Sequence, residues 1–115
     1  MRHTILSVTT ILVLLFAAGC SQKATPEFAK CLSEKGLAMY GTDWCTHCQS
    51  QKKMFGAAFE YVNYTDCDYH KEECAALGID GYPTWIVDGK PLAGEKTLGE
   101  LSLISDCPLE PDNTP

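Results

Sequence analysis

The sequence predicts an α/β domain with a four-stranded mixed central sheet flanked by helices, preceded by an extra N-terminal helix. Short runs rich in β-branched and aromatic residues alternate with segments of helical spacing. Strand–helix–strand units need crossovers and give parallel pairing. Asp88-Gly89 is a hairpin signal, so it adds an antiparallel strand. The length of 115 residues fits one domain.

The N-terminal helix is predicted from its start and stop signals. Thr25 is an N-cap residue, Pro26 occupies the first helical position and Glu27 places an acid in the first turn. Gly36 ends the helix. The short apolar run 37–40 follows, and we expect it to form a buried strand.

A second helix is predicted over residues 45–58, directly after a break in the apolar pattern. Met54, Phe55 and Ala58 recur at helical spacing and are expected to lie on one face of this helix. Residues 61–67 then have the composition of a strand. This strand–helix–strand unit is the first half of the predicted sheet.

The C-terminal half contributes a short helix, a hairpin and a last helix. Residues 70–77 form the short helix, and the hairpin joins strands 84–87 and 90–93. The last helix covers residues 97–106. Its expected inward residues are Leu98, Leu101 and Ile104.

Charge and cysteine content exclude some functions and indicate a compartment. The chain carries 9 Lys and Arg against 15 Asp and Glu, a formal net charge of −6 with no basic run. Binding to nucleic acid or to an anionic lipid surface needs clustered basic residues, so we expect neither. The acidic cluster within residues 66–73 is interpreted as a solvated face, because it lacks the spacing of a calcium loop. Seven cysteines in so short a chain indicate an oxidising compartment, and their odd number needs an explanation.

The N-terminus has the pattern of an export signal. Arg2 precedes an apolar run over residues 5–18, too short for a spanning helix. Ala17-Ala18-Gly19-Cys20 resembles the bacterial lipobox, although Ala17 stands where Leu is usual. We expect a lipoprotein-type signal peptide over 1–19 and lipidation of Cys20, which leaves six cysteines to pair. An ordinary cleaved signal or an uncleaved anchor is the alternative.

The remaining boundaries and the location follow from this interpretation. Residues 20–25 are expected to form a tether, 26–107 the folded domain and 108–115 a disordered tail. The protein is expected on the periplasmic side of the cell envelope, lipid-anchored to a membrane.

The chemistry is expected at Trp44-Cys45-Thr46-His47-Cys48, where a strand ends and a helix begins. A helix N-terminus presents free N–H groups and a positive dipole end, which stabilise a thiolate at Cys45. Cys48 lies within disulfide reach, so we expect Cys45 to attack and Cys48 to resolve. An imidazole at His47 favours the ionised thiol, which makes the disulfide a better oxidant. Half of a zinc site, or a purely structural bridge, is the alternative.

This arrangement, followed by Gly81-Tyr82-Pro83-Thr84 ahead of a strand, resembles the thioredoxin superfamily. In that family a cis proline stands opposite the cysteine pair and shapes the substrate groove. The resemblance implies that Pro83 is cis and that Trp44, Tyr82 and Pro83 line the groove. An ordinary trans proline at the start of a strand is the alternative.

A closer resemblance, over residues 28–107, is to the thioredoxin-like domain associated with bacterial vitamin K epoxide reductase homologues. The shared stretches are Phe28-Ala29-Lys30-Cys31-Leu32, Met39-Tyr40-Gly41, Trp44-Cys45, His47-Cys48-Gln49, Gln51-Lys52-Lys53-Met54-Phe55, Tyr61-Val62-Asn63-Tyr64 and Gly81-Tyr82-Pro83-Thr84-Trp85. In that family the domain takes oxidising equivalents from a quinone-linked membrane enzyme and passes disulfides to exported proteins. This sequence has no four-helix membrane domain, so we expect such a partner to be a separate protein.

Two positions depart from the related families. Thr46 occupies a position that is often Pro in the associated domains, and Met39 stands where cytosolic thioredoxins place a buried carboxylate that takes the proton of the deeper cysteine. The departure at Met39 makes rapid reductase chemistry less natural.

Four further cysteines allow three pairings. Cys67 ends a strand and Cys74 lies on the next short helix, whereas Cys31 lies on the first helix and Cys107 follows the last. We therefore favour structural disulfides Cys67–Cys74 and Cys31–Cys107. The alternative is a relay, in which one of these pairs exchanges electrons with Cys45 and Cys48.

The expected activity is that of an exported thiol-disulfide oxidoreductase that oxidises cysteine-containing envelope proteins, with no cofactor beyond its own redox-active disulfide. Three alternatives stay open. They are a reductase or isomerase of the envelope, a copper or zinc carrier that uses Cys45, His47 and Cys48, and a redox-inactive adaptor.

Overall fold

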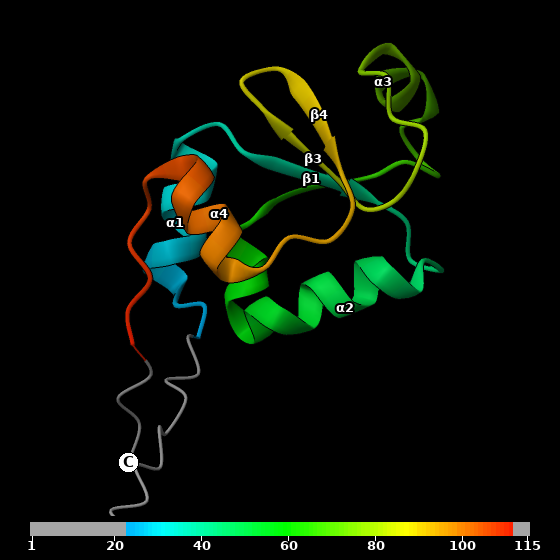
Figure 1. The fold of residues 1–115 in the computed structure, drawn as a ribbon. Helices are drawn as coiled ribbons and strands as arrows, with labels where there is room; N and C mark the ends of the chain where they lie inside the picture. The colour runs from blue at the N-terminus through cyan, green and yellow to red at the C-terminus, as the bar shows by residue number, and fades with distance from the viewer. Residues whose placement is uncertain (1–22, 112–115) are drawn as a thin grey trace, which may run out of the picture.

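The computed structural model of the protein describes residues 23–111 and confirms a thioredoxin-like α/β fold (Figure 1). The predicted signal peptide, Cys20, the first part of the tether and residues 112–115 lie outside the described residues. The elements in chain order are α1 (Pro26–Glu34), β1 (Ala38–Gly41), α2 (Thr46–Phe55), the 3-10 helix η1 (Gly56–Tyr61), β2 (Asn63–Asp66), α3 (Lys71–Ala76), β3 (Thr84–Val87), β4 (Lys90–Ala93) and α4 (Leu98–Ser105).

The four strands form one mixed sheet in the order β2–β1–β3–β4. β1 and β2 are parallel, as a helical crossover requires, and the hairpin makes β3 and β4 antiparallel. The expectation of parallel pairing is wrong for β3, which runs antiparallel to β1. The reason is that α3 lies beyond the end of β2, where the Cys67–Cys74 disulfide holds it. The chain therefore enters β3 at the same end of the sheet at which it leaves β2.

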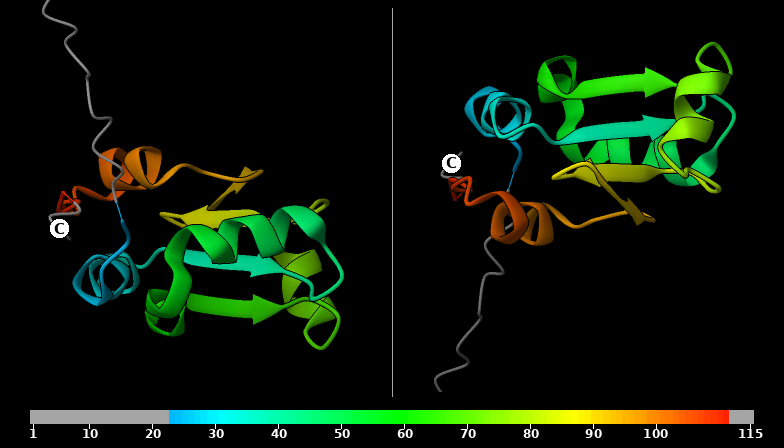
Figure 2. Two further views of the ribbon diagram at one scale, coloured as in Figure 1. Left: turned by 90° about the horizontal axis from the view of Figure 1, so that it is seen from below. Right: turned by 90° about the horizontal axis from the view of Figure 1, so that it is seen from above.

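The two faces of the sheet bury different residues because side chains alternate along each strand. Met39 and Trp85 belong to the larger core, which α1, α2 and α4 cover. Tyr40 and Ile86, their neighbours in sequence, belong to a smaller core with Cys67 and Cys74 beneath α3. Figure 2 shows α2 running along one face of the sheet, with α1 and α4 together at one end.

Local signals set most helix ends where the sequence predicts them. The Thr25 side chain accepts a hydrogen bond from the Phe28 N–H at 3.1 Å and caps α1. Thr97 and Glu100 form a reciprocal capping box at the start of α4. The second helix is shorter than predicted, because the chain turns at Gly56 with φ 55° and continues as η1.

The prediction that Ile104 points inward is wrong, and Met54 is not buried with Phe55 and Ala58. Met54 is 36% exposed and Ile104 is 39% exposed. α2 instead directs Cys48, Gln51 and Phe55 inward, and α4 buries Ser105. Gln51 and Ser105 are polar, so a search for apolar periodicity does not detect these buried faces.

Two disulfides close the fold, at opposite ends. Cys31 on α1 is bonded to Cys107 just after α4, across 76 residues of sequence. Cys67 is bonded to Cys74, only seven residues away. These are the two pairs that the sequence favoured. Within residues 23–111, no helix has the length and apolar character needed to cross a bilayer.

Candidate active site

Cys45 and Cys48 are free thiols at the junction of β1 and α2. Cys45 is the N-cap residue of α2, and its sulfur accepts a hydrogen bond from the Cys48 N–H at 3.1 Å. Cys45 is 7% exposed, whereas Cys48 is completely buried. The first turn of α2 therefore directs a backbone N–H at the more accessible of the two sulfurs.

The segment before β3 lies directly against Cys45. The Tyr82–Pro83 peptide bond is cis, and the Cys45 thiol donates to the Tyr82 carbonyl oxygen at 3.5 Å. Trp44 is 67% exposed and packs edge-to-face on Tyr82, with 6.0 Å between ring centroids. An extended peptide that approached Cys45 would therefore meet an aromatic wall and the backbone that leads into β3. The role of Trp44, Tyr82 and Pro83 as a substrate groove stays a prediction.

A carboxylate that the sequence assigned to a solvated face holds Trp44 in place. The Trp44 indole N–H donates to Asp68 Oδ2 at 2.8 Å. Asp68 follows Cys67 directly, and its own N–H donates to Asp66 Oδ1 at 2.9 Å. Cys67 is disulfide-bonded to Cys74. This disulfide is therefore connected to the active site through Asp68, which binds the Trp44 indole, and Trp44 packs on Tyr82 beside Cys45. No sequence pattern indicates this pairing, because Trp44 and Asp68 are 24 residues apart.

Cys48 is held in its neutral form by its surroundings. Burial, followed by its hydrogen bond with Cys45, raises the pKa of the Cys48 thiol to about 12, against opposing effects of the Thr42 backbone N–H and the Lys52 charge. A Cβ at Gly41 would lie 2.7 Å from the Cys48 sulfur, so glycine is needed for this close approach. Cys48 is therefore suited to act inside the protein on Cys45 rather than on an external partner.

His47 lies on the exposed side of α2 and contacts a carboxylate. Its Nδ1 is 3.1 Å from Glu95 Oε2, and its side chain is 73% exposed. Hydrogen bonds from Ser50 and then His47 hold the pKa of the Glu95 carboxyl below its usual range. The contact ties the loop before α4 to α2. The role of His47 in tuning the Cys45 thiolate stays a prediction.

Gln51 is a buried polar residue that the sequence analysis did not single out. Its Oε1 accepts from the Trp85 indole N–H at 3.1 Å and from the Lys96 N–H at 2.7 Å, and its Nε2 donates to the Lys96 carbonyl at 2.9 Å. These bonds join α2 to β3 and to the loop before α4. Gln51 therefore fixes the helix that carries Cys45 and Cys48 against the strand that follows Pro83.

Metal ligands do not gather in the described part of the chain. Among residues 23–111, no three His, Cys, Asp or Glu side chains are grouped so that they could hold a metal ion. Structural zinc sites normally use four ligands.

Comparisons with known proteins point to redox chemistry. No protein-family model matches the chain. It is 42% identical over 94 residues to thiol-disulfide oxidoreductase LTO1 of Arabidopsis thaliana, covering 74% of this chain and 25% of the relative. It is also 33% and 31% identical to protein disulfide isomerase-like 2-2 and 2-1 of Oryza sativa subsp. japonica, over 57% of this chain and 20% and 22% of those relatives. The chain thus spans about a quarter or less of their length. The names support an oxidoreductase of the thioredoxin-like superfamily.

Proposed function

We propose that this thioredoxin-like thiol-disulfide oxidoreductase is an oxidising enzyme that donates the Cys45–Cys48 disulfide to exported proteins. The observation that carries the proposal is the contrast between the two sulfurs. Cys45 caps a helix beside an exposed aromatic wall, whereas Cys48 is buried and its pKa is raised to about 12. This is the division of labour that a dithiol needs to form and then resolve a mixed disulfide.

The reaction starts from the oxidised pair. A substrate thiolate attacks the Cys45 sulfur, the Cys45–Cys48 bond breaks, and Cys48 leaves as a thiolate that takes a proton. A second substrate thiolate then attacks the substrate sulfur of the mixed disulfide and displaces Cys45 as a thiolate. The substrate loses two electrons and gains a disulfide, and the protein gains the two electrons as the reduced pair.

The direction and the location are parts of the same proposal. The apolar leader and Cys20 support export and lipid attachment on the periplasmic side of the envelope. The stretches shared with domains associated with vitamin K epoxide reductase homologues support a quinone-linked membrane enzyme as the partner that reoxidises Cys45 and Cys48. The two structural disulfides fit an oxidising compartment.

The direct test is oxidation of a reduced peptide that contains two cysteines by the oxidised chain. The native chain should oxidise the peptide stoichiometrically, Cys45→Ser should abolish this, and Cys48→Ser should form only an unresolved mixed disulfide with an activated disulfide reagent. The reduction potential of the pair decides the direction. A potential near that of thioredoxin, about −270 mV, would contradict an oxidising role.

An isomerase is the second candidate, favoured by the names of the two rice relatives. An isomerase would reactivate a protein with scrambled disulfides when supplied in its reduced form. A donor would oxidise the reduced substrate but leave the scrambled one unchanged. Parallel assays on the two forms of one substrate separate these activities.

A further inference from the structure

The surroundings of the Cys48 sulfur lack a buried carboxylate on the adjacent strands. Met39 is completely buried on the face of β1 that packs in the same core as Cys48, and its register partner on β2 is Tyr64. Neither side chain carries a charge, because burial, followed by the charges of Asp66 and Asp43, raises the pKa of the Tyr64 hydroxyl. A Cys48 thiolate that forms during exchange therefore needs its counter-charge from another element.

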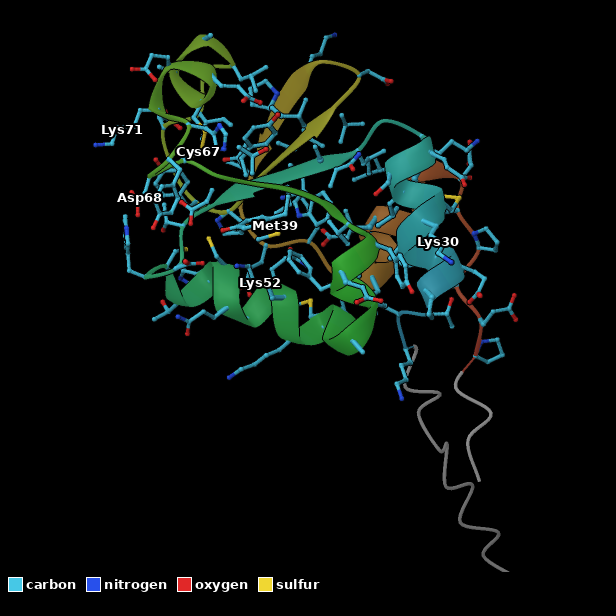
Figure 3. The ribbon with its side chains drawn as sticks, turned by 180° about the vertical axis from the view of Figure 1, so that it is seen from behind. Lys30, Met39, Lys52, Cys67, Asp68 and Lys71 are labelled. Atoms are coloured by element: carbon cyan, nitrogen blue, oxygen red, sulfur yellow. A yellow bond between two sulfur atoms is a disulfide. The ribbon has the colours of Figure 1, made fainter. Side chains whose placement is uncertain are left out.

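α2 itself supplies a cation at this point. Lys52 lies four residues after Cys48, so the two side chains share one side of the helix. The Lys52 ammonium lies 4.0 Å from the centroid of the Tyr64 ring and 5.6 Å from that of Phe59. Its side chain is only 26% exposed. Figure 3 labels Lys52 on α2 and Met39 on the sheet.

The Tyr64 ring connects this cation to the sulfur. A Cβ placed on Gly41 would lie 3.5 Å from Tyr64 Cε2 and 2.7 Å from the Cys48 sulfur, so ring and sulfur both border Gly41. The Lys52 ammonium therefore lies over a ring that borders the same glycine as the Cys48 sulfur. In a site shielded from water, such a charge acts over several ångströms.

We propose that Lys52 is a positioning residue that stabilises the transient Cys48 thiolate and so sets the rate at which the mixed disulfide on Cys45 is formed and resolved. The inference rests on the proposed exchange function. In resolution, the Cys48 thiol loses its proton to solvent, its sulfur attacks Cys45, and the partner thiolate leaves. In the reverse step Cys48 is the leaving group and takes the proton back.

The strength of the Lys52 effect on the Cys48 thiolate depends on the other charged and polar groups nearby. Asp43 Oδ1 lies 3.6 Å from the Lys52 nitrogen and partly neutralises it, but the Asp43 side chain is 78% exposed and well screened. Asp66 on β2 places negative charge near the Tyr64 hydroxyl. Cys45, at the start of α2, is the negative group that acts on Cys48 itself. The Thr42 and Tyr64 hydroxyls are buried without a hydrogen-bond partner among the described residues. Lys52 is the cation among the charged groups that act on Cys48.

The charge should change rates in both directions and leave the equilibrium unchanged. At neutral pH the Cys48 thiol of the reduced protein is uncharged, because burial raises its pKa to about 12. Lys52 therefore stabilises a state that exists only during exchange. A purely structural lysine would instead alter stability and leave the exchange rates of the folded protein unchanged.

The test uses the purified chain with Cys45 and Cys48 reduced and an aromatic disulfide reagent whose thiolate is coloured. The first coloured thiolate reports attack by Cys45, and the second reports resolution by Cys48. Lys52→Met should slow the second release by about tenfold at neutral pH and leave the reduction potential unchanged. Lys52→Arg should restore the rate, and Lys53→Met, on the exposed side of the same helix, serves as the matched control.

Each outcome bears on one of two claims. A second release that is equally fast in Lys52→Met and Lys53→Met would overturn the role of Lys52 and leave the proposed function standing. A slow release that Lys52→Arg does not restore, or a shifted potential, would also overturn it in favour of a structural role. A native chain that releases no thiolate through Cys45 would overturn the proposed function itself, and this inference with it.

Discussion

The two ends of the sheet carry the same covalent chemistry for different purposes. At one end Cys31–Cys107 joins the first and last helices across 76 residues. At the other end Cys67–Cys74 closes a loop of seven residues beside the free thiols of Cys45 and Cys48. Figure 3 shows Cys67 and Asp68 at the end of the molecule opposite Lys30 on α1. One disulfide restrains the whole chain, and the other shapes a local surface around a reactive sulfur.

Chain entropy accounts for part of this difference. A crosslink reduces the freedom of the unfolded chain by an amount that grows with the length of the loop. The separations of 76 and 7 residues correspond to about 4.5 and about 2.5 kcal/mol of stabilisation, as upper figures. The short loop therefore contributes less to stability than the long one. Because it lies beside the site, we expect it to have a second role there.

The largest expected effect is that of removing the long-range disulfide. The double variant Cys31→Ser, Cys107→Ser should lose about 4 kcal/mol of unfolding free energy, measured by urea denaturation. Its rate of peptide oxidation at low temperature should equal that of the native chain, because neither residue approaches Cys45. A slower rate in a variant that is still folded would contradict the claim that Cys31–Cys107 affects stability and not exchange.

The matched variant at the active end should behave in the opposite way. Cys67→Ser, Cys74→Ser should lose only about 2 kcal/mol of unfolding free energy. Its peptide oxidation should nevertheless slow several-fold, because the loop that carries Asp68 no longer holds Trp44. If the two double variants differ only in stability, the local role assigned to Cys67–Cys74 is wrong.

A third expected effect is a pH dependence that belongs to the active end alone. Burial raises the pKa of Cys48 from the usual 9.0 to about 12, so the folded reduced protein keeps a proton that the unfolded chain releases. The corresponding stabilisation is complete below pH 9 and is lost as the pH rises toward 12, by about 1.4 kcal/mol for each pH unit. Urea unfolding of the reduced form should show little pH dependence between pH 7 and pH 8 and should approach this slope between pH 9 and pH 10. The oxidised form has no Cys48 thiol, and an equal slope there would contradict the assignment.

The smallest expected effect concerns the contact between Trp44 and Asp68. Asp68→Ala removes the acceptor of the indole N–H, and we expect a higher KM for peptide oxidation, a nearly unchanged kcat and a stability change within about 0.5 kcal/mol. Asp68→Asn keeps an acceptor oxygen and should restore the native KM. Glu72→Ala removes a charge from the same acidic segment and is the control. If Glu72→Ala raises KM as much as Asp68→Ala does, the effect comes from the lost negative charge, and the role assigned to the hydrogen bond with Trp44 is wrong.

The sequence predicts the order of elements and the reactive pair because both depend on local patterns. Thr25-Pro26 and Gly36 mark the first helix, and Asp88-Gly89 marks the hairpin. A CxxC motif at the end of a strand marks the site without any tertiary information.

The direction of β3 and the neighbours of the two thiols depend on contacts between distant residues. The pairing of Trp44 with Asp68 and the placement of Lys52 on Tyr64 join separate elements, so no local pattern reveals them. The inward position of Gln51 was missed because its bonds to Trp85 and Lys96 replace the apolar contacts that a periodicity test detects.

The most direct test of the account is the order in which the two reduced thiols react. The chain would be treated at neutral pH with less than one equivalent of an alkylating reagent, and the modified cysteine identified by mass spectrometry. The account predicts modification at Cys45, with Cys48 protected in the folded protein and modified only after unfolding. Preferential modification of Cys48, or equal modification of both, would contradict the assignment of Cys45 as the attacking sulfur.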